Sequence, residues 1–151
     1  MKKLYFLFLF PLVTAALNAQ SAKQVQWSYA AQKIADKTYE VHMTATINGN
    51  YHLYAQNAGV EGPLPTTFTF LKNPLAVPDG KLKEVGKLVK KYEPAWPGTV
   101  NYYEKTVDFV QVVKLRGNIK TTLAGVVEFI VCNESQCLPP SKVDIKVNIG
   151  G

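Results

Sequence analysis

Residues 39–47 read Tyr39-Glu40-Val41-His42-Met43-Thr44-Ala45-Thr46-Ile47, with apolar side chains at the odd positions and polar ones at the even positions. Successive side chains of a β-strand point to opposite faces of a sheet, so this alternation predicts a strand with one buried face. Residues 143–149 repeat the same pattern near the C-terminus. Both segments are therefore expected to be half-buried strands of antiparallel sheets.

Three further segments extend the strand pattern. Residues 65–70 and 107–113 are rich in threonine, valine and phenylalanine, and residues 123–131 are apolar except for Gly125 and Glu128. We expect residues 123–131 to form a central strand. In residues 107–113 two consecutive apolar residues, Phe109 and Val110, interrupt the alternation, which predicts a β-bulge.

Clusters of glycine, proline and asparagine separate the predicted strands. They fall at residues 48–50, 59–65, 78–80, 94–98 and 117–118. Short strands at regular spacing, with almost no helical periodicity, are typical of a β-sandwich. We therefore predict an all-β fold, a single immunoglobulin-like antiparallel β-sandwich without internal repeats or linkers.

The N-terminal residues 1–19 are predicted to be a signal peptide for export. Lys2 and Lys3 precede an apolar run at 4–10 that is too short to span a bilayer, and small residues follow it. Cleavage then leaves residues 20–151 as one exported domain. A domain of about 130 residues is long enough to bury a hydrophobic core without needing a disulfide.

The chain is basic, with 17 lysines and arginines against 11 acidic residues and a formal net charge of +6. Without the two signal-peptide lysines the balance is 15 against 11, or +4. Five lysines lie close together in the sequence: Lys81, Lys83, Lys87, Lys90 and Lys91. No aromatic or glycine pattern of a nucleic-acid module accompanies them, so we expect a solvated face and no nucleic-acid partner.

The two cysteines of the chain, Cys132 and Cys137, lie five positions apart and are followed by a double proline. In an oxidising compartment they can pair with each other. A disulfide that closes so short a loop stabilises a fold by only about 2 kcal/mol in the loop-closure model. The polar residues between the cysteines also predict that at least one sulfur lies near solvent, as in labile disulfides. From the residues alone, a redox role and a structural role both remain open.

Other site chemistry finds less support. The Cys-x4-Cys spacing falls within the range of zinc ligands, and His42 and His52 are the only histidines available to complete a set. However, His42 lies on the polar face of its strand, where a solvated side chain is expected, so we predict no metal site. The sequence contains no Gly-x-Ser-x-Gly elbow, phosphate loop or nucleotide fingerprint, and we expect no cofactor.

The order of these motifs resembles the N-terminal periplasmic domain of the thiol:disulfide interchange protein DsbD. The most specific part is the Cys-x4-Cys-x-Pro-Pro segment at 132–140, and residues 50–54, 62–66 and 102–105 support it. The likeness runs from about residue 27 to residue 149. It implies an immunoglobulin-like fold and a domain that passes electrons from a membrane-embedded thiol reductase to exported thioredoxin-like oxidoreductases.

The resemblance also implies roles for individual residues. Cys132 and Cys137 match the family's redox pair, in which Cys137 would form the mixed disulfide with partners and Cys132 would resolve it. Tyr54 matches an aromatic residue that lines the family's active site. His52 lies on the same face of its strand and stands where the family often has tyrosine.

Two further expectations follow from the resemblance. The family covers its disulfide with an aromatic-tipped cap loop, expected here within residues 92–98 with Trp96 at the tip, although a core position is the alternative for this tryptophan. The family protein continues into a membrane domain and a thioredoxin-like domain, whereas this chain ends at Gly151. We therefore expect its electron donor to be a separate polypeptide. The competing hypothesis is a non-catalytic immunoglobulin-like binding module with a permanent Cys132–Cys137 disulfide.

Overall fold

The computed structural model describes residues 20–151, so the predicted signal peptide lies outside the described residues. The elements, in chain order, are α1 (Gln20–Gln24), β1 (Val25–Ala35), β2 (Thr38–Ile47), β3 (His52–Tyr54), β4 (Thr67–Phe70), β5 (Ala76–Glu93), β6 (Gly98–Leu115), β7 (Thr121–Phe129), β8 (Val131–Cys132) and β9 (Ser141–Ile149). No helix among residues 20–151 has the length and apolar character needed to cross a membrane.

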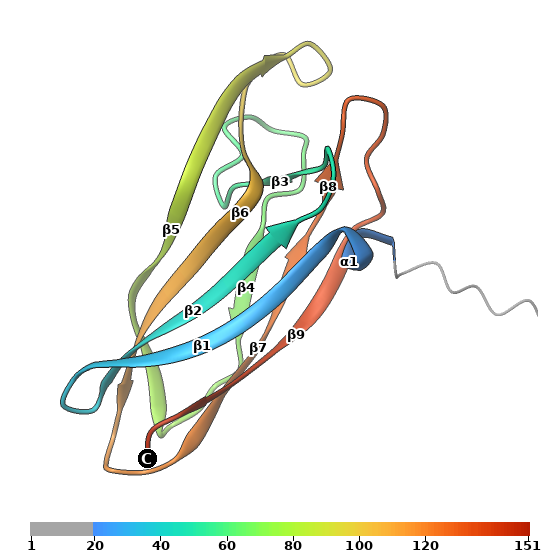
Figure 1. Ribbon diagram of the computed structural model, residues 1–151. Helices are drawn as coiled ribbons and strands as arrows, with labels where there is room; N and C mark the ends of the chain where they lie inside the picture. The colour runs from blue at the N-terminus through green and yellow to red at the C-terminus, as the bar shows by residue number, and fades with distance from the viewer. Residues whose placement is uncertain (1–19) are drawn as a thin grey trace, which may run out of the picture.

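The strands form two antiparallel sheets that face each other (Figure 1). The larger sheet has the order β1-β2-β6-β3-β8, with β5 along the other edge of β6. The smaller sheet has the order β4-β7-β9, so β7 is its central strand. The predicted central strand at 123–131 is confirmed as far as Phe129, whereas Val131 belongs to β8 in the larger sheet. This architecture is the predicted immunoglobulin-like β-sandwich.

The core lies between the sheets and is built from the alternating positions of their strands. In β2 the odd residues from 39 to 47 are buried, as the sequence pattern predicts. Trp27 of β1 joins the two layers: its ring centroid lies 5.8 Å from Phe109 in the larger sheet and 5.6 Å from Phe129 in the smaller one. Aromatic contacts at this distance add to the stabilisation from apolar burial.

The predicted bulge at Phe109 and Val110 is wrong for the pair of strands that it concerns. β6 keeps an unbroken register with β2 across residues 106–114. Val110 breaks the apolar parity because it is buried on the outer face of the sheet, opposite the core face of Phe109, and not because the chain slips. Register shifts occur instead in the pairing of β6 with β5, one between Asp79 and Lys83 and one between Gly86 and Leu88.

A long β5–β6 hairpin is the main feature that the sequence pattern did not reveal. The predicted turn at 94–98 connects the two strands, whereas the predicted turn at 78–80 lies within β5, where Gly80 has a φ of 72°. The five clustered lysines are all exposed on β5, which confirms the expected solvated face. Charged side chains on such an edge strand oppose pairing with another chain.

Glu84 of β5 ties the hairpin to the segment after β3. Its carboxylate accepts a hydrogen bond from the Tyr103 hydroxyl at 3.0 Å and another from the backbone N–H of Gln56 at 2.7 Å. Burial, followed by this hydrogen bond and the charge of Glu84, raises the pKa of Tyr103 well above its ordinary value. The neutral phenol is therefore part of the folded structure.

We expect the domain to lose stability as the pH rises above about 10, where tyrosine ionises in the unfolded chain. Because the pKa of Tyr103 is higher in the folded chain than in the unfolded chain, the residue stabilises the fold at pH values below its pKa in the unfolded chain. This contribution is lost as the pH rises toward its pKa in the folded chain. Tyr103→Phe should lower stability by about 1–3 kcal/mol at pH 8, by removing a hydrogen bond to a charged group, and should flatten the alkaline decline. Denaturant unfolding at a series of pH values checks this. Tyr92→Phe, at an exposed tyrosine of the same hairpin, is the control. An equal alkaline slope in Tyr103→Phe and the wild type would contradict the prediction.

Candidate active site

The cysteine segment begins where the chain changes sheets. β7 ends in the smaller sheet, and after one residue β8 pairs with β3 in the larger sheet. In this pair Val131 lies opposite Leu53, and Cys132 lies opposite His52. Because neighbouring residues of a strand face opposite ways, Val131 joins the main core while Cys132 joins a smaller cluster on the outer face.

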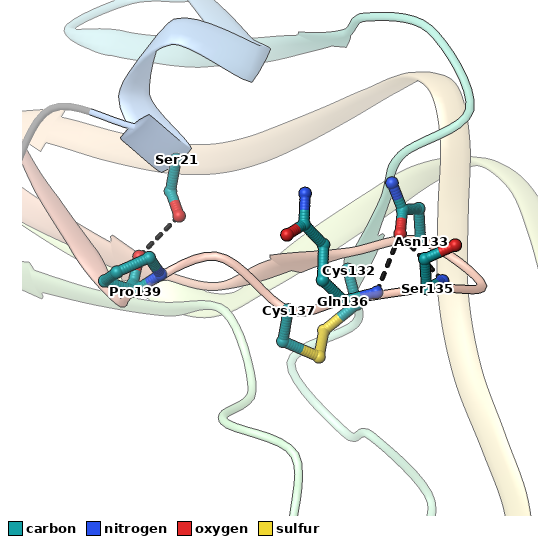
Figure 2. The surroundings of a disulfide bond; sticks show 7 residues. All are labelled: Ser21, Cys132, Asn133, Ser135, Gln136, Cys137 and Pro139. Carbon is teal, nitrogen blue, oxygen red and sulfur yellow. Dashed lines mark hydrogen bonds between the residues drawn. A yellow bond between two sulfur atoms is a disulfide. The ribbon is translucent and has the colours of Figure 1, made fainter.

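Cys132 and Cys137 form a disulfide with their Cα atoms 4.0 Å apart (Figure 2). The two ends of this bond differ in access. Cys132 is only 2% exposed, whereas Cys137 is an exposed residue on the loop. The prediction that at least one cysteine lies near solvent is therefore confirmed, and an approaching protein meets Cys137 first.

Asn133 holds the loop between the cysteines in shape. Its side-chain oxygen accepts hydrogen bonds from the backbone N–H groups of Ser135 and Gln136, both at 2.9 Å, and Figure 2 shows these three residues beside the disulfide. After the loop, the N–H of Leu138 donates to the carbonyl of Val131 at 2.9 Å. These bonds do not involve the sulfur atoms, so they can hold the two cysteines close when the disulfide opens.

The exit from the loop is tied to the N-terminal helix. The Ser21 hydroxyl of α1 donates a hydrogen bond to the carbonyl of Pro139, as Figure 2 shows. The two prolines at 139 and 140 lack N–H donors and restrict the backbone. The loop is thus anchored at both ends, by β8 and by this contact.

A cavity of about 780 Å³ lies beside the disulfide. All five residues singled out from the sequence line it: Cys132, Cys137, His52, Tyr54 and Trp96. The ring of His52 lies between two tyrosines, with centroid distances of 5.2 Å to Tyr54 and 4.4 Å to Tyr102. The structure therefore brings the sequence-predicted residues into one site.

Sequence reasoning missed the charged residues of this cavity. Lys91, Glu93, Glu104 and Lys105 line it from the β5–β6 hairpin. Only the short motif at 102–105 gave a sign that part of β6 belongs to the site. Glu93 lies within the segment 92–98 where the cap loop was expected, whereas Lys91 comes to the cavity through the pairing of β5 with β6, which no local pattern of the sequence predicts.

Trp96 forms one wall of the cavity from the turn between β5 and β6. It is half-buried and packs against the small cluster that contains Tyr54 and Cys132, outside the main core. Its ring lies so close to Gly62, where φ is 132°, that a Cβ at this glycine would collide with the indole. A side chain other than hydrogen at position 62 would therefore displace this wall.

His42 lies apart from this site. Its Nδ1 is 2.7 Å from the Asp108 carboxylate and its side chain is 28% exposed, so the expectation of a freely solvated side chain is wrong. A carboxylate on the neighbouring strand β6 is the physical reason. Among residues 20–151, no group of three or more histidine, cysteine or acidic side chains is placed to hold a metal ion.

The family model described as "Thiol:disulfide interchange protein DsbD, N-terminal" matches residues 16–149. The chain belongs to this family. It is similar in structure to the N-terminal domain of DsbD from Neisseria meningitidis in the reduced form, with a TM-score of 0.57 and 18% identity over 89% of this chain and 95% of that one. It is also similar to the N-terminal periplasmic domain of ScsB from Proteus mirabilis, with a TM-score of 0.57 and 14% identity over 83% of this chain and 46% of that one. At these identities both likenesses show the fold, and no curated protein sequence matches.

In this member of the DsbD N-terminal family, the electrostatics of the site favour neutral side chains. Burial is the main cause that lowers the pKa of His52; Glu93 and Glu104 oppose this effect, and Lys91 adds to it. Burial likewise raises the pKa of Tyr54, although a hydrogen bond with the Trp96 side chain lowers it in part. At neutral pH the imidazole is therefore mainly an uncharged group able to accept a proton.

We expect NMR titration of the two histidine rings to give His52 a pKa below about 6.5, the ordinary value. His42→Gln assigns the signals, because the chain has only two histidines. Because the pKa of His52 is lower in the folded chain than in the unfolded chain, the group stabilises the fold at pH values above its pKa in the unfolded chain. This contribution is lost as the pH falls through its pKa in the folded chain. A His52 pKa at or above about 6.5 would show that burial does not dominate.

Proposed function

We propose that this domain is a periplasmic dithiol–disulfide carrier that takes electrons from a membrane-embedded thiol reductase and passes them to exported thioredoxin-like proteins. Family membership supports thiol:disulfide interchange in general. The observation that carries the finer proposal is the asymmetry of the disulfide, with Cys132 buried on β8 and Cys137 exposed on a short loop. The proposal includes export by the predicted signal peptide at 1–19, and it requires no cofactor.

The exchange proceeds in two steps. In the reduced domain, the Cys137 thiolate attacks the partner's disulfide, forms a mixed disulfide and releases one partner thiolate. The Cys132 thiolate then attacks the Cys137 sulfur, restores the Cys132–Cys137 bond and releases the second partner thiolate. Two electrons and two protons leave the domain in total, and exchange with the reductase runs the same steps in reverse.

The surroundings of the disulfide fit these roles. Cys137 is the cysteine that an incoming protein can reach, while Cys132 lies directly behind it and is held there by β8. Tyr54 and Trp96 form an apolar wall beside them, where a partner's chain can pack.

We expect the reduced single variants to differ strongly in reactivity toward glutathione disulfide. Cys132→Ser, which keeps the exposed Cys137, should form its glutathione adduct faster than Cys137→Ser by about tenfold or more, since access controls thiol reactivity. Intact-mass spectrometry over time measures both rates, and unfolding in denaturant, where the difference should vanish, is the control. Equal rates in the folded variants would remove the basis for assigning the attacking role to Cys137.

We also expect the wild-type disulfide to have a reduction potential above about −300 mV, in the labile range. Reduction should leave the far-ultraviolet circular dichroism unchanged and lower stability by only about 2 kcal/mol. Thiol alkylation across a dithiothreitol series measures the potential. A much lower potential, or unfolding on reduction, would instead support the non-catalytic immunoglobulin-like binding module with a structural disulfide.

A further inference from the structure

His52 and Cys132 are direct neighbours across the β3–β8 pair. Residues opposite each other in an antiparallel pair project to the same face, with Cβ atoms about 4.5–5.5 Å apart. Both residues line the cavity beside the disulfide. An imidazole nitrogen is therefore within reach of the Cys132 sulfur, which no other histidine of the described chain approaches, since His42 is held against Asp108.

From this geometry we propose that His52 is the proton acceptor for the Cys132 thiol when Cys132 resolves a mixed disulfide on Cys137. The proposal rests on the exchange function proposed above and deepens it. A buried thiol is a poor nucleophile until it loses its proton. Solvent reaches Cys132 poorly at 2% exposure, so a base within the site has to take that proton.

The packing of the ring suits this task. Tyr102 lies against His52 in a tilted arrangement, and Tyr54 meets it edge-on at 89°. These contacts limit rotation of the imidazole and hold it on the cavity side of β3. The lowered pKa of His52, caused chiefly by burial, keeps the ring in the neutral form that can accept a proton.

The charged groups around the site do not stabilise a cysteine thiolate, so proton removal from Cys132 requires a base. The titratable and charged groups facing His52 and the cysteines come from β3, β5, β6 and the loops at 49–51 and 133–137: Tyr51, Tyr54, Lys91, Glu93, Tyr102, Glu104, Lys105, Glu134 and Cys137. Three carboxylates thus stand against two lysines, and Lys91 is paired with Glu93 at 3.1 Å. No net positive field is present to hold either cysteine as a standing thiolate.

The step balances in atoms and electrons. The neutral imidazole takes the proton of the Cys132 thiol, and the resulting thiolate attacks the Cys137 sulfur of the mixed disulfide. The Cys132–Cys137 bond forms as the bond between Cys137 and the partner breaks, and its electron pair leaves on the partner's sulfur. The imidazolium then gives its proton to this leaving thiolate or to water.

The aromatic disulfide dithiobis(nitrobenzoate) tests the proposal on the fully reduced domain in stopped flow. Attack by Cys137 releases the first coloured thionitrobenzoate, and resolution by Cys132 releases the second. A free thiol is only a few per cent ionised near pH 7, so His52→Gln should slow the second release by about tenfold and leave the first unchanged. In the wild type the second rate should level off above the His52 pKa, whereas in the variant it should keep rising toward the ordinary thiol pKa of about 8.5. His42→Gln, at the other histidine, should behave as wild type.

A second variant separates proton transfer from packing. In His52→Ala, added imidazole should restore the second release in proportion to its concentration, which a purely structural role would not allow. An unchanged second release in His52→Gln, or a slowed one with no imidazole rescue and an unaltered pH profile, overturns the proposal while leaving the exchange function intact. A wild-type domain that releases only one thionitrobenzoate would overturn both.

Discussion

The backbone pairing between β3 and the two-residue strand β8 is the constraint on which the site depends. It places Val131 opposite Leu53 in the main core and Cys132 opposite His52 on the outer face. A slip of one residue would exchange these faces, putting the sulfur into the core and a valine into the cavity. Burial of Val131 and Leu53, both fully inaccessible to solvent, opposes that slip. Pairing in the hydrophobic core thus fixes the position of the Cys132 residue, which lies outside that core.

The second constraint is the change of partner along β6. This strand pairs with β2 as far as Thr106 and with β3 from Glu104, so Lys105 marks the junction. Lys105 has a φ of 63°, in the left-handed region, where a residue with a Cβ pays about 1–2 kcal/mol. This change of partner lets one strand serve both the core and the cavity. The part of β6 that pairs with β3 carries Tyr102 of the small cluster, and the part that pairs with β2 carries Phe109 of the main core. The local strain therefore lies beside the site and not in the core.

These constraints also explain which features the sequence could predict. Alternation identified β2 and β9 because each has one face in the core, and the same period of two put His52 and Tyr54 on one face. The strand β5 escaped prediction because it is an exposed edge strand, where lysines and the Pro78-Asp79-Gly80 sequence resemble a loop. The contribution of Lys91 to the site depends on pairing across the hairpin, which a sequence window of a few residues does not reveal. The pattern of residues 107–113 wrongly predicted a bulge for a related reason. Val110 is apolar because it is buried on the outer face of the sheet.

Neither cysteine belongs to the main core, and this separates stability from chemistry. A disulfide over so short a loop contributes only about 2 kcal/mol. The main core of aromatic and aliphatic residues between the sheets includes neither cysteine. The hydrogen bonds of Asn133 hold the loop without help from the sulfur atoms. The bond can therefore open and close against a nearly constant framework, so the cost of changing redox state stays local. A structural disulfide stabilises a fold most in the opposite arrangement, in which it joins cysteines that are distant in sequence and lie in the core. The placement of this pair at the edge of the fold, beside a cavity and a neutral imidazole, accordingly favours exchange chemistry over reinforcement.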